Sequence, residues 1–475
     1  MAKSRRTITV VFGALIGLLV LVAITMFLFL DVNAYKPRIE AAVSENLGME
    51  VKVGGRLGIG FFPSLLITLE DLHIRNRGTE VATARAARIG LDFLTLLHKG
   101  FQIERITLEH PIISIERDRD GKFNFEQSEA GRGPLPNLNL ARISLANGTF
   151  RYLDRASGEG FEAGDCSLDM SRLQASGREQ PDIMKNLSFA AELACGKIRT
   201  KDYAASDLKF SVAGQRGSFD LKPVTMRVFS GQGSGSIQAD FTGAVPLYQV
   251  RYTLSQFHID EFLKILSPQE IAHGPMDFSA NLSMQGKTMN ELRQTAAGKI
   301  TLRGENLTLN GRDLDREFAR YESSQHFNLV DVGAYVLIGP LGLIVTKGYN
   351  FARIYQGSGG HSEIRTLVSD WKVAHGVAQA QDVAMATNKN RIALHGGLDF
   401  VNSRFDAVTV ALIDARGCAK VQQRIRGSFQ KPVVEEPNTL KSAAGPVRKL
   451  LKQVRNLFPG GACAVFYAGS VASPK

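Results

Sequence analysis

The chain has 475 residues, of which 44% are hydrophobic, so it can bury a sizeable core and is not a mostly disordered chain. Its net charge of +11 is modest for this length and is not gathered into one arm, except at residues 441–455. Without a basic and aromatic signature, nucleic acid is a poor inference, and an anionic lipid surface is a better partner for the excess charge. Abundant glycine, few prolines and alternating Leu, Ile, Val, Thr and Phe runs indicate a mainly β protein.

Residues 8–30 predict a transmembrane anchor. This uncharged run of 23 residues is preceded by Lys3, Arg5 and Arg6 and followed by Asp31. It is long enough to cross a bilayer core of ~30 Å, and its basic flank places residues 1–7 in the cytoplasm. A cleaved signal peptide is the alternative, since residues 32–34 form a tolerable cleavage triplet, but the run exceeds the ~7 to 15 residues of a signal h-region. The chain after residue 34 is then outside the cytoplasm, in the periplasm if the source is a Gram-negative bacterium.

A short helix is predicted directly after the anchor, within residues 35–49. Pro37 lies near its first turn and Gly48 ends it. The apolar face of this helix is expected to be Ile39, Ala42, Val43 and Leu47. The helical period then disappears from Val51 for more than 200 residues, as in a β region.

A small repeat runs through this β region. The triplet "ITL" occurs at 67–69, 106–108 and 300–302, and "ISL" occurs at 143–145. The first three copies are 39 and 37 residues apart, which suggests repeated supersecondary units. Each copy is followed by a break and a second apolar pair: Leu72 and Ile74, Ile113 and Ile115, Phe150 and Tyr152, and Leu307 and Leu309.

The second pair after Leu69 falls on the opposite parity of a straight strand. A β-bulge or a kink between two half-strands reverses parity and bends the strand, so both halves can point their apolar residues into one concavity. Bent strands stacked edge to edge would form a long groove with an apolar inside. The residues predicted to line it are Ile67, Leu69, Leu72, Ile74, Ile106, Leu108, Ile113, Ile115, Ile143 and Leu145. Taken singly, each of them is ordinary core.

Later segments continue the pattern with more interruptions. Two further β units are expected from Gly217 and from Val377, and helices are expected at 259–274 and around 314–324. The uncharged segment 332–346 is too short to span a membrane. It is read either as a buried helix pair or as an interfacial, lipid-touching segment.

The last helix is expected within residues 445–458 and is amphipathic and basic. Its candidate membrane-surface residues are Arg448, Lys449, Lys452 and Arg455. Such a helix can lie on a layer of lipid head groups or cover the end of a sheet.

The four cysteines agree with an oxidising compartment. We expect Cys166 to pair with Cys195, and Cys418 with Cys463; two unconnected pairs of buried thiols are the alternative. No C-x-x-C motif occurs, so neither zinc nor redox chemistry is indicated.

No catalytic signature survives inspection. The "GKT" at 286–288 lacks the upstream glycine of a P-loop, and the glycines of 231–235 lack the spacing of a dinucleotide site. "DRDG" at 118–121 is expected to be a hairpin turn rather than a calcium loop. We therefore expect no enzyme, no cofactor and no metal site.

Several motifs, in order along the chain, resemble the AsmA family of bacterial envelope proteins. They are Asp31 and Asn33 before the helix, "LGMEVKVGGRLG", Phe62-Pro63, "DLHIRN", the run from Pro111 to Asn124 with one extra residue, "GPLGLIVTKG", "GGLDF", "RIRGSFQKPVV" and "CAVFYAGSV". The resemblance covers nearly the whole chain, with the middle matching in pattern alone.

The resemblance implies an inner-membrane, single-pass protein with a periplasmic body and an elongated curved β-sheet groove of the bridge-like lipid-transfer kind. Such a protein would take part in phospholipid transport toward the outer membrane and in outer-membrane homeostasis. The regions are then a tail (1–7), an anchor (8–30), an N-terminal β-groove region (31–300) and a C-terminal α+β region (301–475). A scaffold or assembly factor for outer-membrane or other envelope proteins is the alternative function.

Overall fold

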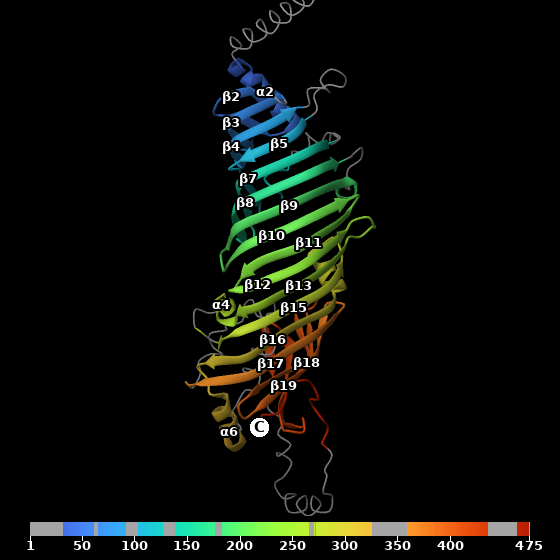
Figure 1. Ribbon diagram of the computed structural model, residues 1–475. Helices are drawn as coiled ribbons and strands as arrows, with labels where there is room; N and C mark the ends of the chain where they lie inside the picture. The colour runs from blue at the N-terminus through green and yellow to red at the C-terminus, as the bar shows by residue number, and fades with distance from the viewer. Residues whose placement is uncertain are drawn as a thin grey trace, which may run out of the picture. The chain divides into compact units, whose positions relative to one another are not determined.

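A computed structural model describes residues 32–60, 65–91, 103–126, 138–175, 183–265, 270, 272–324, 359–435 and 463–474 (Figure 1). The expected anchor (8–30), the uncharged segment 332–346 and the basic helix within 445–458 lie outside the described residues. Among the described helices, none has the length and apolar character needed to cross a membrane.

The described residues are mainly β, as predicted, with 22 strands in one mixed sheet. The strands are β1 (Glu50–Val53), β2 (Leu57–Gly60), β3 (Leu65–Asn76), β4 (Thr79–Leu91), β5 (Ile103–Glu109), β6 (Ile112–Arg117), β7 (Leu138–Asp154), β8 (Gly160–Ala175), β9 (Leu187–Thr200), β10 (Ala204–Gln215), β11 (Ser218–Val228), β12 (Gly231–Asp240), β13 (Leu247–His258), β14 (Ala272–His273), β15 (Pro275–Gln285), β16 (Ala297–Asn310), β17 (His361–Ala374), β18 (Val377–Thr387), β19 (Arg391–Asp399), β20 (Arg404–Ile413), β21 (Ala419–Ser428) and β22 (Lys431–Val434). The described helices are short: η1 (Val32–Tyr35), α2 (Lys36–Leu47), η3 (Ile183–Asn186), α4 (Ile259–Leu263), α5 (Met289–Thr295) and α6 (Leu314–Ser324).

The chain divides into two compact units. Unit 1 comprises residues 1–133 and 139–167, and unit 2 comprises residues 134–138 and 168–475. In unit 1, β3 pairs with β1, β2 and β4, and β4 continues to β5 and β6, all antiparallel. Strand β7 then pairs in parallel with both β5 and β6. The parallel pairing of β7 therefore makes the sheet mixed.

Unit 2 is an antiparallel meander with few exceptions. Strands β9 to β13 pair in sequence order, β13 pairs with β15, and β15 to β22 continue in order. The short β14 pairs with β16. Figure 1 shows β9 to β13 as neighbouring arrows. The β units expected from Gly217 (β11 and β12) and from Val377 (β18 and β19) are confirmed.

The helix predictions are confirmed in part. Helix α2 ends at Gly48, whose φ of 64° is the left-handed cap that glycine favours. Ile39 and Val43 pack on the core of unit 1, whereas Ala42 and Leu47 are exposed, so the expected apolar face is narrower than predicted. Helix α6 forms as expected. The helix expected over 259–274 was wrong at its end, because Ala272 and His273 pair with β16 instead.

Helix α5 was not predicted, and it explains the "GKT" run. The Thr288 hydroxyl caps the helix by accepting a hydrogen bond from the Glu291 amide at 3.3 Å. Glu291 in turn accepts one from the Lys287 amide at 2.6 Å. This is a reciprocal capping arrangement, so the run starts a helix.

Two motif asparagines hold unit 1 together locally. Asn76, at the end of "DLHIRN", donates to the carbonyls of Asn124 and Glu126 at 2.7 and 2.9 Å. Asn124 donates to the Ser114 carbonyl and accepts from the Glu116 amide. Residues 118–121 form the predicted turn, with the Asp118 carboxylate accepting the Lys122 amide at 2.8 Å. These motif residues therefore stabilise the fold.

The main core lies in unit 2, on one face of β16 to β21. Trp371, Met385, Ile392, Leu398 and Val408 have no exposed area. A second cluster covers the other face of β17 to β20, where Ala384, Ala393 and Ala411 pack with Tyr467 and Val471 of the C-terminal segment 463–474. Both faces of these strands are therefore buried.

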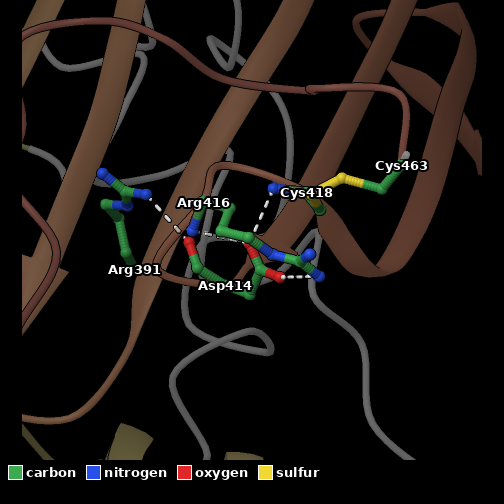
Figure 2. The surroundings of a disulfide bond; sticks show 5 residues. All are labelled: Arg391, Asp414, Arg416, Cys418 and Cys463. Atoms are coloured by element: carbon green, nitrogen blue, oxygen red, sulfur yellow. Dashed lines mark hydrogen bonds and ion pairs between the residues drawn. A yellow bond between two sulfur atoms is a disulfide. The ribbon is translucent and has the colours of Figure 1, made fainter. Parts of the chain in front are cut away.

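The C-terminal segment is fastened by a disulfide and by hydrogen bonds. Cys418 and Cys463 are bonded, with their Cα atoms 6.0 Å apart (Figure 2). Figure 2 also shows Asp414, which accepts the Cys418 amide with its carboxylate and an Arg391 N–H with its carbonyl oxygen, both at 2.8 Å. The hydrogen bond from Cys418 lowers the pKa of Asp414. Cys166 and Cys195 are buried and are not free thiols.

Candidate functional site

The repeated triplets of unit 1 lie side by side on neighbouring strands. Ile67 of β3 is paired across the sheet with Ile89, then with Ile106 and Ile143. The next row contains Leu69, Ala87, Leu108 and Leu145. The spacing of 37 residues is thus the register offset between β5 and β7, which pair in parallel. The repeats form continuous apolar rows across the sheet.

The predicted bend is present in the strands. Asp71, His110, Asn147 and Asn306 follow the four triplets, and all four have φ between 47° and 53°. In β3, Leu69 and Leu72 are 5% and 9% exposed, while the two residues between them are exposed. Both halves of β3 therefore face the same side, so the apolar pattern changes parity as predicted. The change is a kink at Asp71 and not an extra residue opposite β4, because the register with β4 is the same on both sides of Asp71.

Two glycines of the motif "LGMEVKVGGRLG" support the bend at Asp71. The Gly54 and Gly55 amides donate to the carbonyls of Asp71 and Glu70 at 2.8 and 2.9 Å. A Cβ atom at Gly54 would lie 2.0 Å from the Asp71 carboxylate. His73 contacts the carboxylates of Glu80 and Asp71 at 2.7 and 3.1 Å, and the hydrogen bond with Glu80 raises its pKa.

The rows beyond the bend contain the remaining predicted residues. Ile74, Ala82, Ile113 and Phe150 form one row, and Ile115 is paired with Tyr152. All ten candidate residues therefore lie on the apolar face of unit 1.

Their burial differs along that face. Ile67, Leu69, Leu72, Ile74 and Leu108 belong to the cluster on which α2 packs. Of the ten, Leu69, Leu72 and Leu145 are buried, and the other seven are partly exposed.

Unit 2 carries a longer apolar face, which sequence patterns had not singled out. One row across β9 to β15 consists of Ala191, Val212, Leu221, Ile237, Val250 and Leu282. The next row is Leu193, Phe210, Val224, Gly235, Tyr252, Ala280, Ile300 and Trp371, which reaches β17. We call this surface the apolar face of unit 2.

The opposite face of the same strands is polar. Ser236, Arg251, Asn281 and Lys299 form one of its rows, and Ser234, Thr253, Ser279 and Thr301 form another. The alternation expected of a sheet with one wet face is therefore clean. On the apolar face, however, Leu221, Ile237, Val250 and Leu282 remain partly exposed. Their side chains are available to an apolar ligand.

The glycine run at 231–235 belongs to this apolar face. A Cβ atom at Gly233 would lie 1.8 Å from the Tyr252 hydroxyl, and one at Gly231 would lie 2.6 Å from Phe257. The glycines thus make room for aromatic rings of β13. The Tyr252 hydroxyl is buried with no hydrogen-bond partner among the described residues, and this burial raises its pKa.

In the ranges that the structure describes, no three His, Cys, Asp or Glu side chains gather into a possible metal site. The four basic candidates Arg448, Lys449, Lys452 and Arg455 lie outside the described residues.

Bent strands, cross-strand apolar rows and a polar reverse face define the class of this protein as a mainly β protein with a partly exposed apolar sheet face. A family model confirms the resemblance seen in the motifs: the AsmA family model matches residues 1–191 and 135–326, which is more than half of the chain. The chain belongs to the AsmA family, a family of bacterial envelope proteins. None of the curated proteins matches it.

Proposed function

We propose that this protein is a periplasmic lipid-binding protein anchored in the inner membrane by residues 8–30. It would contribute to phospholipid transport between the inner and outer membranes and to outer-membrane homeostasis. The observation that carries the proposal is the apolar face of unit 2, whose rows run across six and eight strands with partly exposed side chains.

The mechanism needs no catalytic residue, and we propose that the protein is not an enzyme. Acyl chains would lie on the apolar face while head groups stay at the sheet edge in water. Each methylene group removed from water contributes about 0.8 kcal/mol. An acyl chain that moves along a continuous apolar row keeps this contribution, because it stays on an apolar surface. A break in the rows would impose the cost of hydrating the acyl chain.

The candidate residues of unit 1 would serve the same role where they remain open. Ile106, Ile113, Ile115 and Ile143 are partly exposed and lie outside the cluster on which α2 packs, so an acyl chain could reach them. Those packed near α2 would act as core that holds the bend in place.

Site-specific photocrosslinking in the full-length protein tests the proposal. A photoreactive residue at Ile237, on the apolar face, should crosslink to phospholipid in cells, whereas the same residue at Ser236, on the polar face, should not. Both positions are partly exposed, so they differ in face rather than in access. Equal labelling of both, or no lipid at Ile237 in a folded protein, would contradict the proposal. Crosslinks at Ile237 to envelope proteins alone would instead support a scaffold.

A further inference from the structure

A cationic pocket lies at one edge of the sheet in unit 2. It has a volume of about 590 Å³ and is lined by residues of β9 to β12, the turn after β11, and Glu261 of α4. We call it the edge pocket. The hairpins joining β9 to β10 and β11 to β12 both turn at this edge, because the strands are antiparallel.

The edge pocket lies where the apolar face ends. Ile198, Ala205 and Val228 form the last apolar row of β9 to β11, and all three line the pocket. The adjacent row is polar and contains Lys197, Ser206, Arg227 and Gln232, which line it as well. Residues of the apolar face and of the polar face therefore border one cavity at the ends of these strands.

Positive charge exceeds negative charge in this lining. The lining contains Lys197, Arg199 and Arg227 and one acidic residue, Glu261, whose carboxylate accepts the Ser230 hydroxyl at 2.6 Å. Arg227 lies 3.9 Å from Asp207, but both side chains are more than half exposed, so the pair is weak. Arg199 lies near the end of β9, and its side chain is exposed. The pocket therefore favours an anion.

The turn that forms one wall of the pocket is held in an unusual conformation. Phe229 and Ser230 have φ of 51° and 57°. Such turns favour Asn-Gly, and a bulky residue at positive φ is strained. The Phe229 ring is held by the rings of Tyr203 at 5.7 Å and Phe262 at 5.5 Å. This packing keeps an aromatic wall beside the cations, where an acyl chain would enter.

We propose that the edge pocket binds the phosphate of a glycerophospholipid head group, with the acyl chains continuing onto the apolar face of unit 2. This inference rests on the proposed function and deepens it, because it assigns the part of the lipid that is recognised. Guanidinium groups bind phosphate oxygens through paired, charge-assisted hydrogen bonds. A free phosphate ion would use the arginines but not Ile198, Val228 and Phe229, so the mixed lining favours an amphiphile.

Native mass spectrometry of the full-length protein tests the inference. The protein is incubated with an equimolar mixture of phosphatidylglycerol and diacylglycerol, which share acyl chains but differ in phosphate. The wild-type protein should retain phosphatidylglycerol at least about tenfold more than diacylglycerol. Diacylglycerol has no phosphate, so it cannot accept the one or two charge-assisted hydrogen bonds that the arginines would donate. The Arg199→Ala/Arg227→Ala variant should retain both lipids about equally.

Arg251→Ala is the matched control, because Arg251 is an exposed arginine on the polar face of β13 and does not line the pocket. It should keep the wild-type ratio. A double variant that keeps the wild-type ratio, or a wild-type protein that retains both lipids equally, overturns the inference while the proposed function stands. A wild-type protein that retains neither lipid contradicts the proposed function itself.

Inorganic phosphate separates the two sources of the anion. Added at the same concentration as the lipid, it should not reduce retention of phosphatidylglycerol by the wild-type protein. If inorganic phosphate alone displaces the lipid at that concentration, the pocket is a site for the free ion, and the inference is overturned.

Discussion

Two regions of unit 2 share antiparallel strand pairing but differ in which faces of the sheet are buried. In β9 to β13, one face is apolar and partly exposed, and the reverse face is polar. In β17 to β20, both faces are buried where the C-terminal segment packs. The change lies in the reverse face, where the row Ser234, Thr253, Ser279 and Thr301 gives way to the row Val368, Ala384, Ala393 and Ala411. Small apolar residues there let the C-terminal segment pack on the sheet.

Burial in this molecule is therefore set by what covers the sheet rather than by how the strands pair. We call β17 to β20 the sealed region and β9 to β13 the open region. Burial of apolar area stabilises the sealed region, whereas part of the apolar area of the open region stays exposed. An open apolar face contributes less to folding and can contribute more to binding. The following substitutions test whether the two regions are distinct in this way.

The largest contrast is expected between two isoleucines. Ile392 of β19 is 0% exposed, whereas Ile237 of β12 is partly exposed. Ile392→Ala should lower the free energy of unfolding by about 2 to 5 kcal/mol, because it leaves a cavity. Ile237→Ala should cost about 1 kcal/mol, because its side chain is already partly hydrated. Chemical denaturation of both variants measures the contrast, and equal losses would show that the regions do not differ in packing.

Removing the disulfide should loosen the sealed region alone. Cys418 and Cys463 are 45 residues apart, and the chain-entropy model gives about 4 kcal/mol for a loop of that size, with about 2 to 4 kcal/mol typical. The Cys418→Ser/Cys463→Ser variant should lose amide protection at Tyr467 and Val471. Hydrogen exchange in β9 to β13 should not change. Faster exchange in both regions would mean that the C-terminal segment stabilises more than the face it covers.

Asp382 makes the attachment of the C-terminal segment sensitive to pH. Burial would raise the pKa of Asp382, but hydrogen bonds from Ser470 and Tyr467 outweigh it and hold the pKa below its ordinary value. A carboxyl with a lowered folded-state pKa contributes stability above its unfolded-state pKa, and this contribution is lost as the pH falls through the folded-state pKa. Protection of Val471 should therefore fall below about pH 4.

Asp382→Asn is the corresponding variant. It should destabilise the attachment by about 1 to 2 kcal/mol at neutral pH, since charge-assisted hydrogen bonds are lost. It should also remove the acid dependence of exchange at Val471. An unchanged pH profile in the variant would assign the transition to another carboxyl group.

The bends were predictable from the sequence, but their number was not. The phase slip after Leu69 and its recurrence after Leu145 predict bulges, because apolar residues on a single face must keep their parity unless the strand bends. Asp207, Gln256 and Ala407 also have φ near 50° inside strands. No apolar triplet marks them. The spacing of 37 residues predicted a repeat, yet it could not reveal that the chain returns to pair in parallel.

The sequence predicted that apolar strand faces form the candidate site, but it did not predict that the longer face lies in unit 2. Apolar strand faces were expected in unit 1, where α2 covers part of them through Ile39 and Val43. The longer open face in unit 2 was missed because Gly233 and Gly235 interrupt the apolar alternation of β12, and their role depends on rings from β13. The sealed region carries a signal that could have been used, since residues 410–413 are apolar at four successive positions, which is typical of strands buried on both faces.

The smallest expected effect concerns the hydroxyl of Tyr252 on the open face. This group is buried without a partner among the described residues, and an unpaired buried hydroxyl costs about 1 to 3 kcal/mol. Tyr252→Phe should therefore leave the free energy of unfolding unchanged or raise it by about 1 kcal/mol, because it removes the unpaired group and keeps the ring over Gly233. A loss of stability in lipid-free protein would show that the hydroxyl is already hydrogen-bonded. If stability rises while retention of phosphatidylglycerol falls, the Tyr252 hydroxyl donates a hydrogen bond to the bound lipid. The open face then combines apolar contacts with one specific polar contact, which the sealed region does not need.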